Sequence, residues 1–299
     1  MFSARAIESL VMSFPKEMVV PRIKVALRED CGSYIREKFY FASERNFEVP
    51  AMLLVPKRAK PDRKGKALLA LHGHGHGLSD VTGTFDYPGM AKNAHETGYD
   101  YAHRFAEAGY VVMTIDSRAF GELADISCGA AYPLANSLGR PLVGMRVWDA
   151  MRALDILEKR PEVDPNRIGC TGLSWGGTHT AYLSMLDQRV KAALVSGYFS
   201  DFEDILYREA GCPCQHLPGV AAKFDFQDLL FGLVAPRPLY IQNGVKDPLY
   251  TPEAVRKAFR EGSRIYRVLG APKNAVLEMH DGAHEYRFAP ALEWFSKVL

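Results

Sequence analysis

Short apolar runs alternate with longer helical patterns along most of this chain. Each run is too brief for a helix and is typical of a buried parallel strand. The runs cover residues 67–71, 110–115, 167–171, 191–195, 238–242 and 275–279. Apolar residues at helical spacing between the runs predict helices over residues 99–108, 142–159, 177–185, 252–269 and 290–298. The alternation predicts a doubly wound α/β fold with a mostly parallel sheet.

Two further strands are expected ahead of this alternation. Residues 36–43 and 47–55 flank a short polar link, which predicts an antiparallel hairpin at the edge of the sheet. Counting the hairpin, we expect about eight strands, flanked by helices. Residues 1–35 are expected to form a helical extension packed on a main domain that spans residues 36–299.

Two stretches interrupt the alternation of strands and helices. Residues 117–140 and 197–235 each follow a predicted strand, so both should lie over the carboxyl edge of the sheet. Open α/β folds bind their ligands at this edge. We expect loops or small cap elements there. Whether residues 197–235 form a mobile lid is left open.

Composition and charge narrow the class of partner. Among 299 residues, 47% are hydrophobic and 24% are charged, which excludes a disordered, collagenous or coiled-coil chain. The formal net charge of +2 gives no electrostatic reason to expect nucleic acid or an anionic membrane surface as a partner. A neutral small molecule suits this chain better. The sequence leaves the oligomeric state open, and a homo-oligomer is one of the open alternatives.

The cysteines and the N-terminal residues bear on the compartment. An odd number of scattered cysteines in a chain of this size predicts reduced thiols. The first twenty residues are broken by Glu8, Ser13 and Pro15, unlike a signal peptide, and no run approaches the length of a membrane span. We therefore expect a cytoplasmic protein. The cysteines are Cys31, Cys128, Cys170, Cys212 and Cys214.

The pattern Gly-x-Ser-x-Gly lies between a predicted strand and a predicted helix. Gly172, Ser174 and Gly176 form it, directly after the run that ends at residue 171. This is the setting of a nucleophile elbow, in which a sharp turn lifts a serine hydroxyl clear of the sheet. The alternative is a glycine-rich turn with an incidental serine. We expect Ser174 to be a nucleophile.

A serine nucleophile needs an imidazole base and a carboxylate that orients it. Asp247 and His284 each follow a predicted strand, and the chain order serine, acid, histidine is that of α/β-hydrolases. We assign them as acid and base. Asp247 could instead be a turn or capping residue, with an acid at another position after the preceding strand, and another histidine could be the base. The substitutes are Asp201, Asp204 and His280.

Two backbone N–H groups should hold the oxyanion. One is expected from Trp175, after the nucleophile, and the other from His74, in a loop where glycine and histidine alternate. The histidines of this loop, and separately Cys212 and Cys214 with His216, invite a metal interpretation. Neither group has the paired spacing of a zinc motif, so we expect no metal, and we interpret the two cysteines as part of a packed loop held by Pro213.

These motifs resemble those of α/β-hydrolases in the dienelactone hydrolase and acetyl xylan esterase-related group. The resemblance spans about residues 36–299 and is carried by residues 71–73, 172–177, 244–248 and 281–284. It implies the α/β-hydrolase fold, an acyl-enzyme, no cofactor, and acetyl or other short acyl esters as substrates. Dienelactone hydrolases carry a cysteine in the elbow, so the serine favours carboxylesterase chemistry. The repeated His-Gly pairs depart from the simpler loop of relatives.

We therefore predict a serine carboxylesterase that hydrolyses short-chain esters. Tyr198 and Phe199 could bind the substrate in an apolar pocket, or they could pack beneath the cap. One alternative is a serine peptidase of the prolyl-oligopeptidase type, although about 35 residues ahead of the sheet leave no room for a propeller. Another is a non-catalytic binding protein on the same fold, which usually lacks one of the three catalytic residues.

Overall fold

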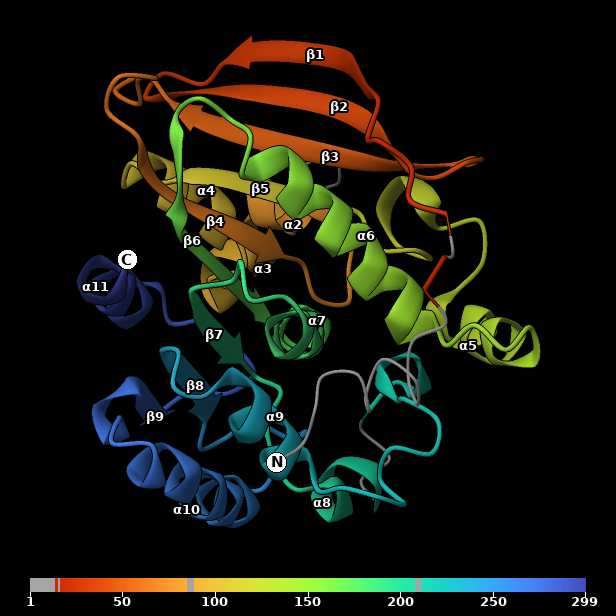
Figure 1. Ribbon diagram of the computed structural model, residues 1–299, viewed down its shortest axis with the longest axis vertical. Helices are drawn as coiled ribbons and strands as arrows, with labels where there is room; N and C mark the ends of the chain where they lie inside the picture. The colour runs from red at the N-terminus through yellow and green to blue at the C-terminus, as the bar shows by residue number, and fades with distance from the viewer. Residues whose placement is uncertain (1–13, 16, 85–88, 208–210) are drawn as a thin grey trace.

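The computed structural model describes residues 14–15, 17–84, 89–207 and 211–299 of the chain. Their strands form one sheet of nine, in the order β1-β2-β3-β5-β4-β6-β7-β8-β9 (Figure 1). The strands are β1 (Ile23–Asp30), β2 (Tyr34–Glu44), β3 (Phe47–Pro56), β4 (Gly65–Leu71), β5 (Val111–Ile115), β6 (Val163–Leu173), β7 (Ala192–Ser196), β8 (Leu239–Gly244) and β9 (Ala275–His280).

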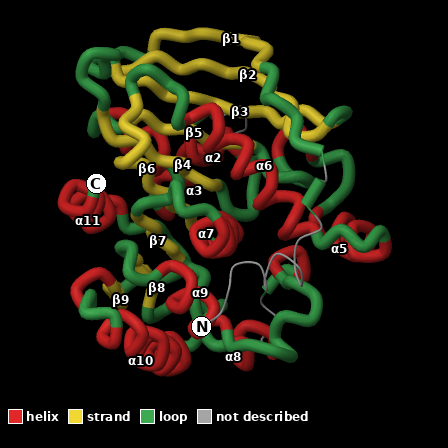
Figure 2. The backbone as a smooth tube through the Cα atoms, in the orientation of Figure 1, coloured by secondary structure: helices red, strands yellow, loops and turns green. Residues whose placement is uncertain are grey.

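The described helices lie on both faces of this sheet, as the red tube segments of Figure 2 show. They are α2 (Leu78–Thr82), α3 (Met90–Thr97), α4 (Tyr101–Glu107), α5 (Cys128–Ser137), α6 (Leu142–Leu157), α7 (Trp175–Leu186), α8 (Phe202–Tyr207), α9 (Phe226–Val234), α10 (Pro252–Val268) and α11 (Phe288–Val298). Short 3₁₀ turns are η1 (Gly121–Leu123), η2 (Pro213–Gln215) and η3 (Pro272–Asn274). No described helix is both long enough and apolar enough to cross a membrane.

The sheet has an antiparallel part and a parallel part. Strands β5, β4, β6, β7, β8 and β9 pair in parallel, whereas β1, β2 and β3 pair antiparallel with one another and β3 pairs antiparallel with β5. The carboxyl ends of the parallel strands therefore meet at one edge. This arrangement confirms the predicted α/β fold with a mostly parallel sheet.

Burial on both faces explains why the parallel strands are apolar throughout. On one face, side chains of α6, α7, α9 and α10 pack against the sheet, with Leu154, Leu183 and Phe231 among those excluded from solvent. On the other face, α4 and α11 contribute Phe105 and Phe295. Each strand thus needs apolar residues in both directions.

The N-terminal region differs from the expectation of a helical extension. Residues Ile23–Asp30 form β1, an edge strand that pairs with β2 and is exposed along its whole length. Large apolar side chains recur at every second position, at Ile23, Val25 and Leu27, which is a strand period. The sheet has nine strands for this reason, and the predicted hairpin, β2 and β3, lies one strand inside the edge. The expected helix over residues 1–13 falls outside the described residues.

The two predicted cap stretches do contain small elements. Residues 117–140 hold η1 and α5, and residues 197–235 hold α8, η2 and α9. Helix α9 belongs to the core, however, because Phe226, Leu229, Leu230 and Phe231 are fully buried. The apolar run of α9 is too short for its helical period to be separated from a buried loop by sequence alone.

Candidate functional site

Ser174 lies at the junction of β6 and α7, in a conformation that non-glycine residues seldom adopt. Its φ is 62° and its ψ is −120°, and its N–H donates to the Ser196 carbonyl at 2.9 Å. A Cβ on Gly176 would collide with the Leu71 carbonyl, and one on Gly172 would collide with the Gly176 backbone. The turn therefore requires glycine at both flanking positions. A strained residue held this way by its surroundings is typical of a functional site.

Asp247 and His284 meet at the carboxyl ends of β8 and β9. The Nδ1–H of His284 donates to Asp247 Oδ2 at 2.8 Å, and the Leu249 N–H donates to Asp247 Oδ1 at 2.9 Å. Asp247 is 6% exposed, whereas the His284 side chain is 24% exposed. The buried carboxylate holds one ring nitrogen as a donor, which leaves Nε2 of His284 free to accept a proton.

A glycine allows the His284 ring to occupy its place. Gly197 has a φ of +57°, and a Cβ there would lie 2.9 Å from Cε1 of His284. Sequence reasoning did not single out Gly197. Its position directly after strand β7 was the available signal, because glycine at a strand end often marks a close approach of other groups.

The substitute residues do not reach this pair. His280 is buried, with Nδ1 3.7 Å from Glu285 Oε1, and burial lowers its pKa. Asp201 accepts hydrogen bonds from the Asp204 N–H and from Lys257, while Asp204 accepts them from Ser200 and Thr251. Of the candidate acids and bases, Asp247 and His284 are the two that are hydrogen-bonded to each other.

Ser174 and His284 line one pocket of about 460 Å³. No hydrogen bond joins Ser174 Oγ to His284 among the contacts of the described residues. Hydrogen bonds between catalytic groups are often long or poorly aligned before a substrate binds. The pocket thus brings the predicted nucleophile and base together across an open space. The other lining residues are His74, Thr97, Tyr99, Cys212, Gln215 and Leu249.

The loop after β4 lies beside the nucleophile. His74 lines the pocket, and its carbonyl accepts a hydrogen bond from the Tyr99 hydroxyl at 3.1 Å. A Cβ on Gly73 would lie 2.8 Å from the Leu173 carbonyl, so glycine lets the loop pass close to the elbow. Trp175 is the first residue of α7, and its N–H is one of the four that have no partner within a helix. Trp175 thus adjoins Ser174 in sequence, and His74 lines the same pocket as Ser174.

Two other histidines near the site are buried and neutral. The Ser117 N–H donates to His72 Nε2 at 3.0 Å, so His72 carries its proton on Nδ1, which donates to the Gly73 carbonyl. His179 Nε2 donates to the Arg146 carbonyl at 2.9 Å. Burial lowers the pKa of His72 to about 4 and that of His179 to about 3. They support the loop and the elbow from beneath, outside the pocket.

The residues expected to bind substrate lie elsewhere. Phe199 is fully buried against Phe226 and Phe231, and Tyr198 is 1% exposed and packs against Phe226. Neither is among the described residues that line the Ser174 pocket. Their burial against the rings of Phe226 and Phe231 agrees with the alternative that they pack beneath the cap. Trp175 is likewise buried, and its indole N–H donates to Ser117 Oγ.

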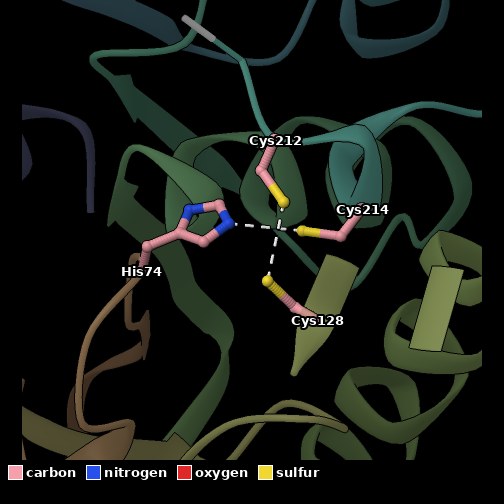
Figure 3. A group of neighbouring side chains, drawn as sticks. All are labelled: His74, Cys128, Cys212 and Cys214. Atoms are coloured by element: carbon pink, nitrogen blue, oxygen red, sulfur yellow. Dashed lines mark hydrogen bonds between the residues drawn. The ribbon is translucent and has the colours of Figure 1, made fainter. Parts of the chain in front are cut away.

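The sequence analysis expected no metal in either cysteine or histidine cluster, but the structure joins parts of both. His74, Cys128, Cys212 and Cys214 present ligand atoms that all lie within 4.8 Å of one another (Figure 3). Cys128 begins helix α5 and was not part of either motif. Its separation from the others in sequence hid the cluster, because only the folded chain brings α5 against η2.

Part of the chain matches a known protein family. A model of the dienelactone hydrolase family matches residues 86–219. YtaP of Bacillus subtilis (strain 168), named as a hydrolase, is 27% identical over 241 residues, which cover 75% of this chain and 74% of that protein. The match to YtaP covers more of this chain than the match to the family model does.

The solved structures similar to this one include esterases. A Bacteroides fragilis NCTC 9343 protein named as an acetyl xylan esterase has a TM-score of 0.76 at 18% identity, covering 93% of this chain and 73% of its own. A glucuronoyl esterase from Solibacter usitatus has a TM-score of 0.70 at 16% identity, covering 98% and 91%. At these identities, the likeness to the two esterases shows a shared fold. Residues 86–219 thus resemble the dienelactone hydrolase family, and the chain as a whole has an α/β-hydrolase fold.

Proposed function

We propose that this protein is a serine carboxylesterase that hydrolyses short-chain, acetyl-type esters. The observation that carries the proposal is the hydrogen bond of His284 Nδ1 to Asp247 in a pocket that also holds Ser174. The three residues come from the ends of β6, β8 and β9, which are separated in sequence. A serine, a histidine and a carboxylate in this relation support nucleophilic acyl transfer.

In the first half of the reaction, Ser174 Oγ attacks the ester carbonyl carbon while His284 Nε2 takes the hydroxyl proton. The carbonyl oxygen becomes an oxyanion, to which the N–H groups of His74 and Trp175 would donate. The carbon–oxygen bond to the alcohol then breaks, and His284 returns the proton to the departing oxygen. Asp247 stabilises the positively charged ring between these steps, which leaves an acyl group on Ser174.

In the second half, a water molecule attacks the acyl carbon and His284 again takes the proton. The bond to Ser174 Oγ breaks, the proton passes to the serine, and a carboxylic acid leaves. The pocket of about 460 Å³ lies within the usual range for a small-molecule site. Its size supports a small acyl group.

The activity can be tested with two chromogenic substrates and one covalent inhibitor. We expect turnover of p-nitrophenyl acetate, little or no turnover of an aminoacyl p-nitroanilide, and a phosphonate adduct on Ser174 by peptide mass spectrometry. Preferential cleavage of the anilide would instead support a peptidase. The absence of both turnover and adduct would support a non-catalytic binding protein, and an adduct on another residue would reject Ser174 as the nucleophile.

A further inference from the structure

Four soft ligand atoms converge beside the pocket from three separate segments. His74 comes from the loop after β4, Cys128 from the first residue of α5, and Cys212 and Cys214 from the turn at η2. His74 Nε2 lies 3.3 Å from Cys214 Sγ, and Cys128 Sγ lies 3.5 Å from Cys212 Sγ. Figure 3 shows these two contacts crossing at a common centre, toward which all four side chains point.

The spacing matches a tetrahedral zinc site. With zinc–sulfur bonds of about 2.3 Å and zinc–nitrogen bonds of about 2.0 Å, neighbouring ligand atoms in a tetrahedron lie roughly 3.5–3.8 Å apart. The observed separations of 3.3 and 3.5 Å, within an overall limit of 4.8 Å, need only small shifts to reach this geometry. Three thiolates and one imidazole are a common ligand set for structural zinc.

The charge around the cluster provides an independent argument. Arg146 is fully buried, and its guanidinium donates to the carbonyls of Arg118 and Cys214. No carboxylate pairs with it among the described residues, and it lies over the ring of Trp175 at 4.3 Å. A buried cation without a countercharge is costly. A zinc ion with three thiolates and a neutral imidazole carries one net negative charge, which would compensate Arg146.

The surroundings of His74 also suit a metal ligand. Its second ring nitrogen, Nδ1, lies 3.5 Å from the side-chain amide of Gln215, which can accept the Nδ1–H once the amide is turned. A metal-bound histidine usually donates its other N–H in this way. Phe120 packs edge-to-face on the same ring, with centroids 5.2 Å apart. Nε2 is thereby directed at the sulfur atoms.

We propose that His74, Cys128, Cys212 and Cys214 bind one zinc ion. Four protein ligands leave no open position, so the ion is structural. It links the loop after β4, helix α5 and the η2 turn, and these segments contribute His74, Cys212 and Gln215 to the pocket wall. If the proposed esterase function holds, the ion also fixes the backbone that carries the His74 N–H. The zinc assignment itself does not depend on that function.

A disulfide between Cys128 and Cys212 is the competing interpretation of this cluster. Their sulfur atoms lie 3.5 Å apart, well beyond the bonding distance of about 2 Å. Such a bond would also leave Cys214, His74 and the charge of Arg146 without a role. The two interpretations predict different chemistry for the purified protein, which makes them separable.

The test measures metal in the whole protein, purified with a reductant and without chelator. Elemental analysis of the wild type should find about one zinc per chain. After removal of zinc by a chelator, cobalt(II) added to the same protein should produce visible absorption and thiolate-to-cobalt charge-transfer bands of a tetrahedral site. Zinc at background level with no such cobalt spectrum would overturn the proposal. Iron or copper in place of zinc would overturn the choice of metal. A Cys128–Cys212 disulfide in protein that is isolated without reductant, and that holds no metal before any chelator is added, would overturn the proposal in favour of the redox interpretation.

Matched variants separate the cluster from cysteines in general. Cys214→Ser should lower the bound zinc at least tenfold, whereas Cys31→Ser should keep it, because Cys31 lies outside the cluster. The cobalt spectrum of the wild type decides the question even if Cys214→Ser fails to fold. Phosphonate labelling of Ser174, measured on the same samples, reports the proposed esterase separately. A wild type that holds zinc but is not labelled would reject the esterase and keep the metal site.

Discussion

Two groups of chemically active side chains lie at the carboxyl edge of the sheet, and they are held in different ways. Ser174 follows strand β6 directly, and Asp247 and His284 lie in the turns just after β8 and β9, where they are hydrogen-bonded to each other. The paired backbone of the sheet and this hydrogen bond set their positions. The cluster of His74, Cys128, Cys212 and Cys214 is carried by a loop, the start of a helix and a short turn. Groups on loops gain most from an added link, because the backbone alone restrains them less.

The two groups should therefore respond differently to substitution. Loss of a catalytic side chain should lower the rate of ester hydrolysis with little effect on folding, since the sheet holds the backbone in either case. Loss of a cluster residue should change metal content and the stability of the covering segments. Substitutions at the catalytic residues and at the histidines beneath them can break or sharpen this contrast.

Replacing the nucleophile should have the largest effect. Ser174→Ala is expected to lower kcat/KM for p-nitrophenyl acetate by about 10⁵-fold or more, because the attacking oxygen is lost and only binding and the oxyanion donors are left. The thermal unfolding midpoint and the zinc content should stay near those of the wild type. A variant that keeps most of its turnover would contradict the assignment of Ser174. A large drop in the unfolding midpoint would contradict the expectation that the sheet holds the elbow without the serine side chain.

Neutralising the acid should have a smaller effect on turnover. Asp247→Asn is expected to slow the reaction by about 10²–10⁴-fold, because an amide can hold the His284 ring in the wrong tautomer and cannot stabilise its charge. Steady-state kinetics should show the loss in kcat more than in KM. Asp201→Asn is the matched control, since Asp201 contacts Asp204 and Lys257 and not His284. Equal losses in both variants would argue against Asp247.

Acid should destabilise the fold through the buried histidines beneath the site. The folded chain keeps His179 neutral, with a pKa of about 3, while the unfolded chain protonates it below its ordinary value of 6.5. The unfolded state therefore binds more protons between about pH 6.5 and pH 3, and stability falls as pH falls through this range. His72, with a pKa of about 4, acts in the same direction.

The variant His179→Asn removes one of these titrating groups while keeping a donor for the Arg146 carbonyl. Its free energy of unfolding in urea, measured at several pH values, should depend on pH less steeply than that of the wild type, by roughly 1 kcal/mol per pH unit. His76→Asn is the control, because His76 is exposed. Parallel pH profiles for wild type and His179→Asn would show that His179 titrates normally in the folded chain.

The smallest effect concerns the conformation of the elbow. Ser174 has a φ of 62°, which glycine adopts without strain and alanine does not. Ser174→Gly should therefore be more stable than Ser174→Ala by about 1 kcal/mol, and both should be equally inactive. Denaturant unfolding of the pair measures the difference. A glycine variant less stable than the alanine variant would mean that the elbow carries no such strain.

Much of the architecture could be predicted from local patterns. The run at 275–279 and the periodic stretch at 142–159 correspond closely to β9 (Ala275–His280) and α6 (Leu142–Leu157), because burial on both sides of a strand and on one side of a helix leaves a clear period. Strand β1 was missed because it lies at an exposed edge, where little burial shapes the sequence. Helix α9 was missed because its apolar run is short.

The sequence by itself determined the elbow and the order of Ser174, Asp247 and His284, since each of these depends on a motif of a few adjacent residues at the end of a strand. The tertiary structure alone decided the pairing of Asp247 with His284, the burial of Phe199 in the core, and the meeting of Cys128 with His74, Cys212 and Cys214. The physical reason is the separation along the sequence over which each interaction acts. Turn geometry and burial period act over a few residues, whereas these contacts join segments tens to more than a hundred residues apart, and only the packing of helices on the sheet brings such segments together.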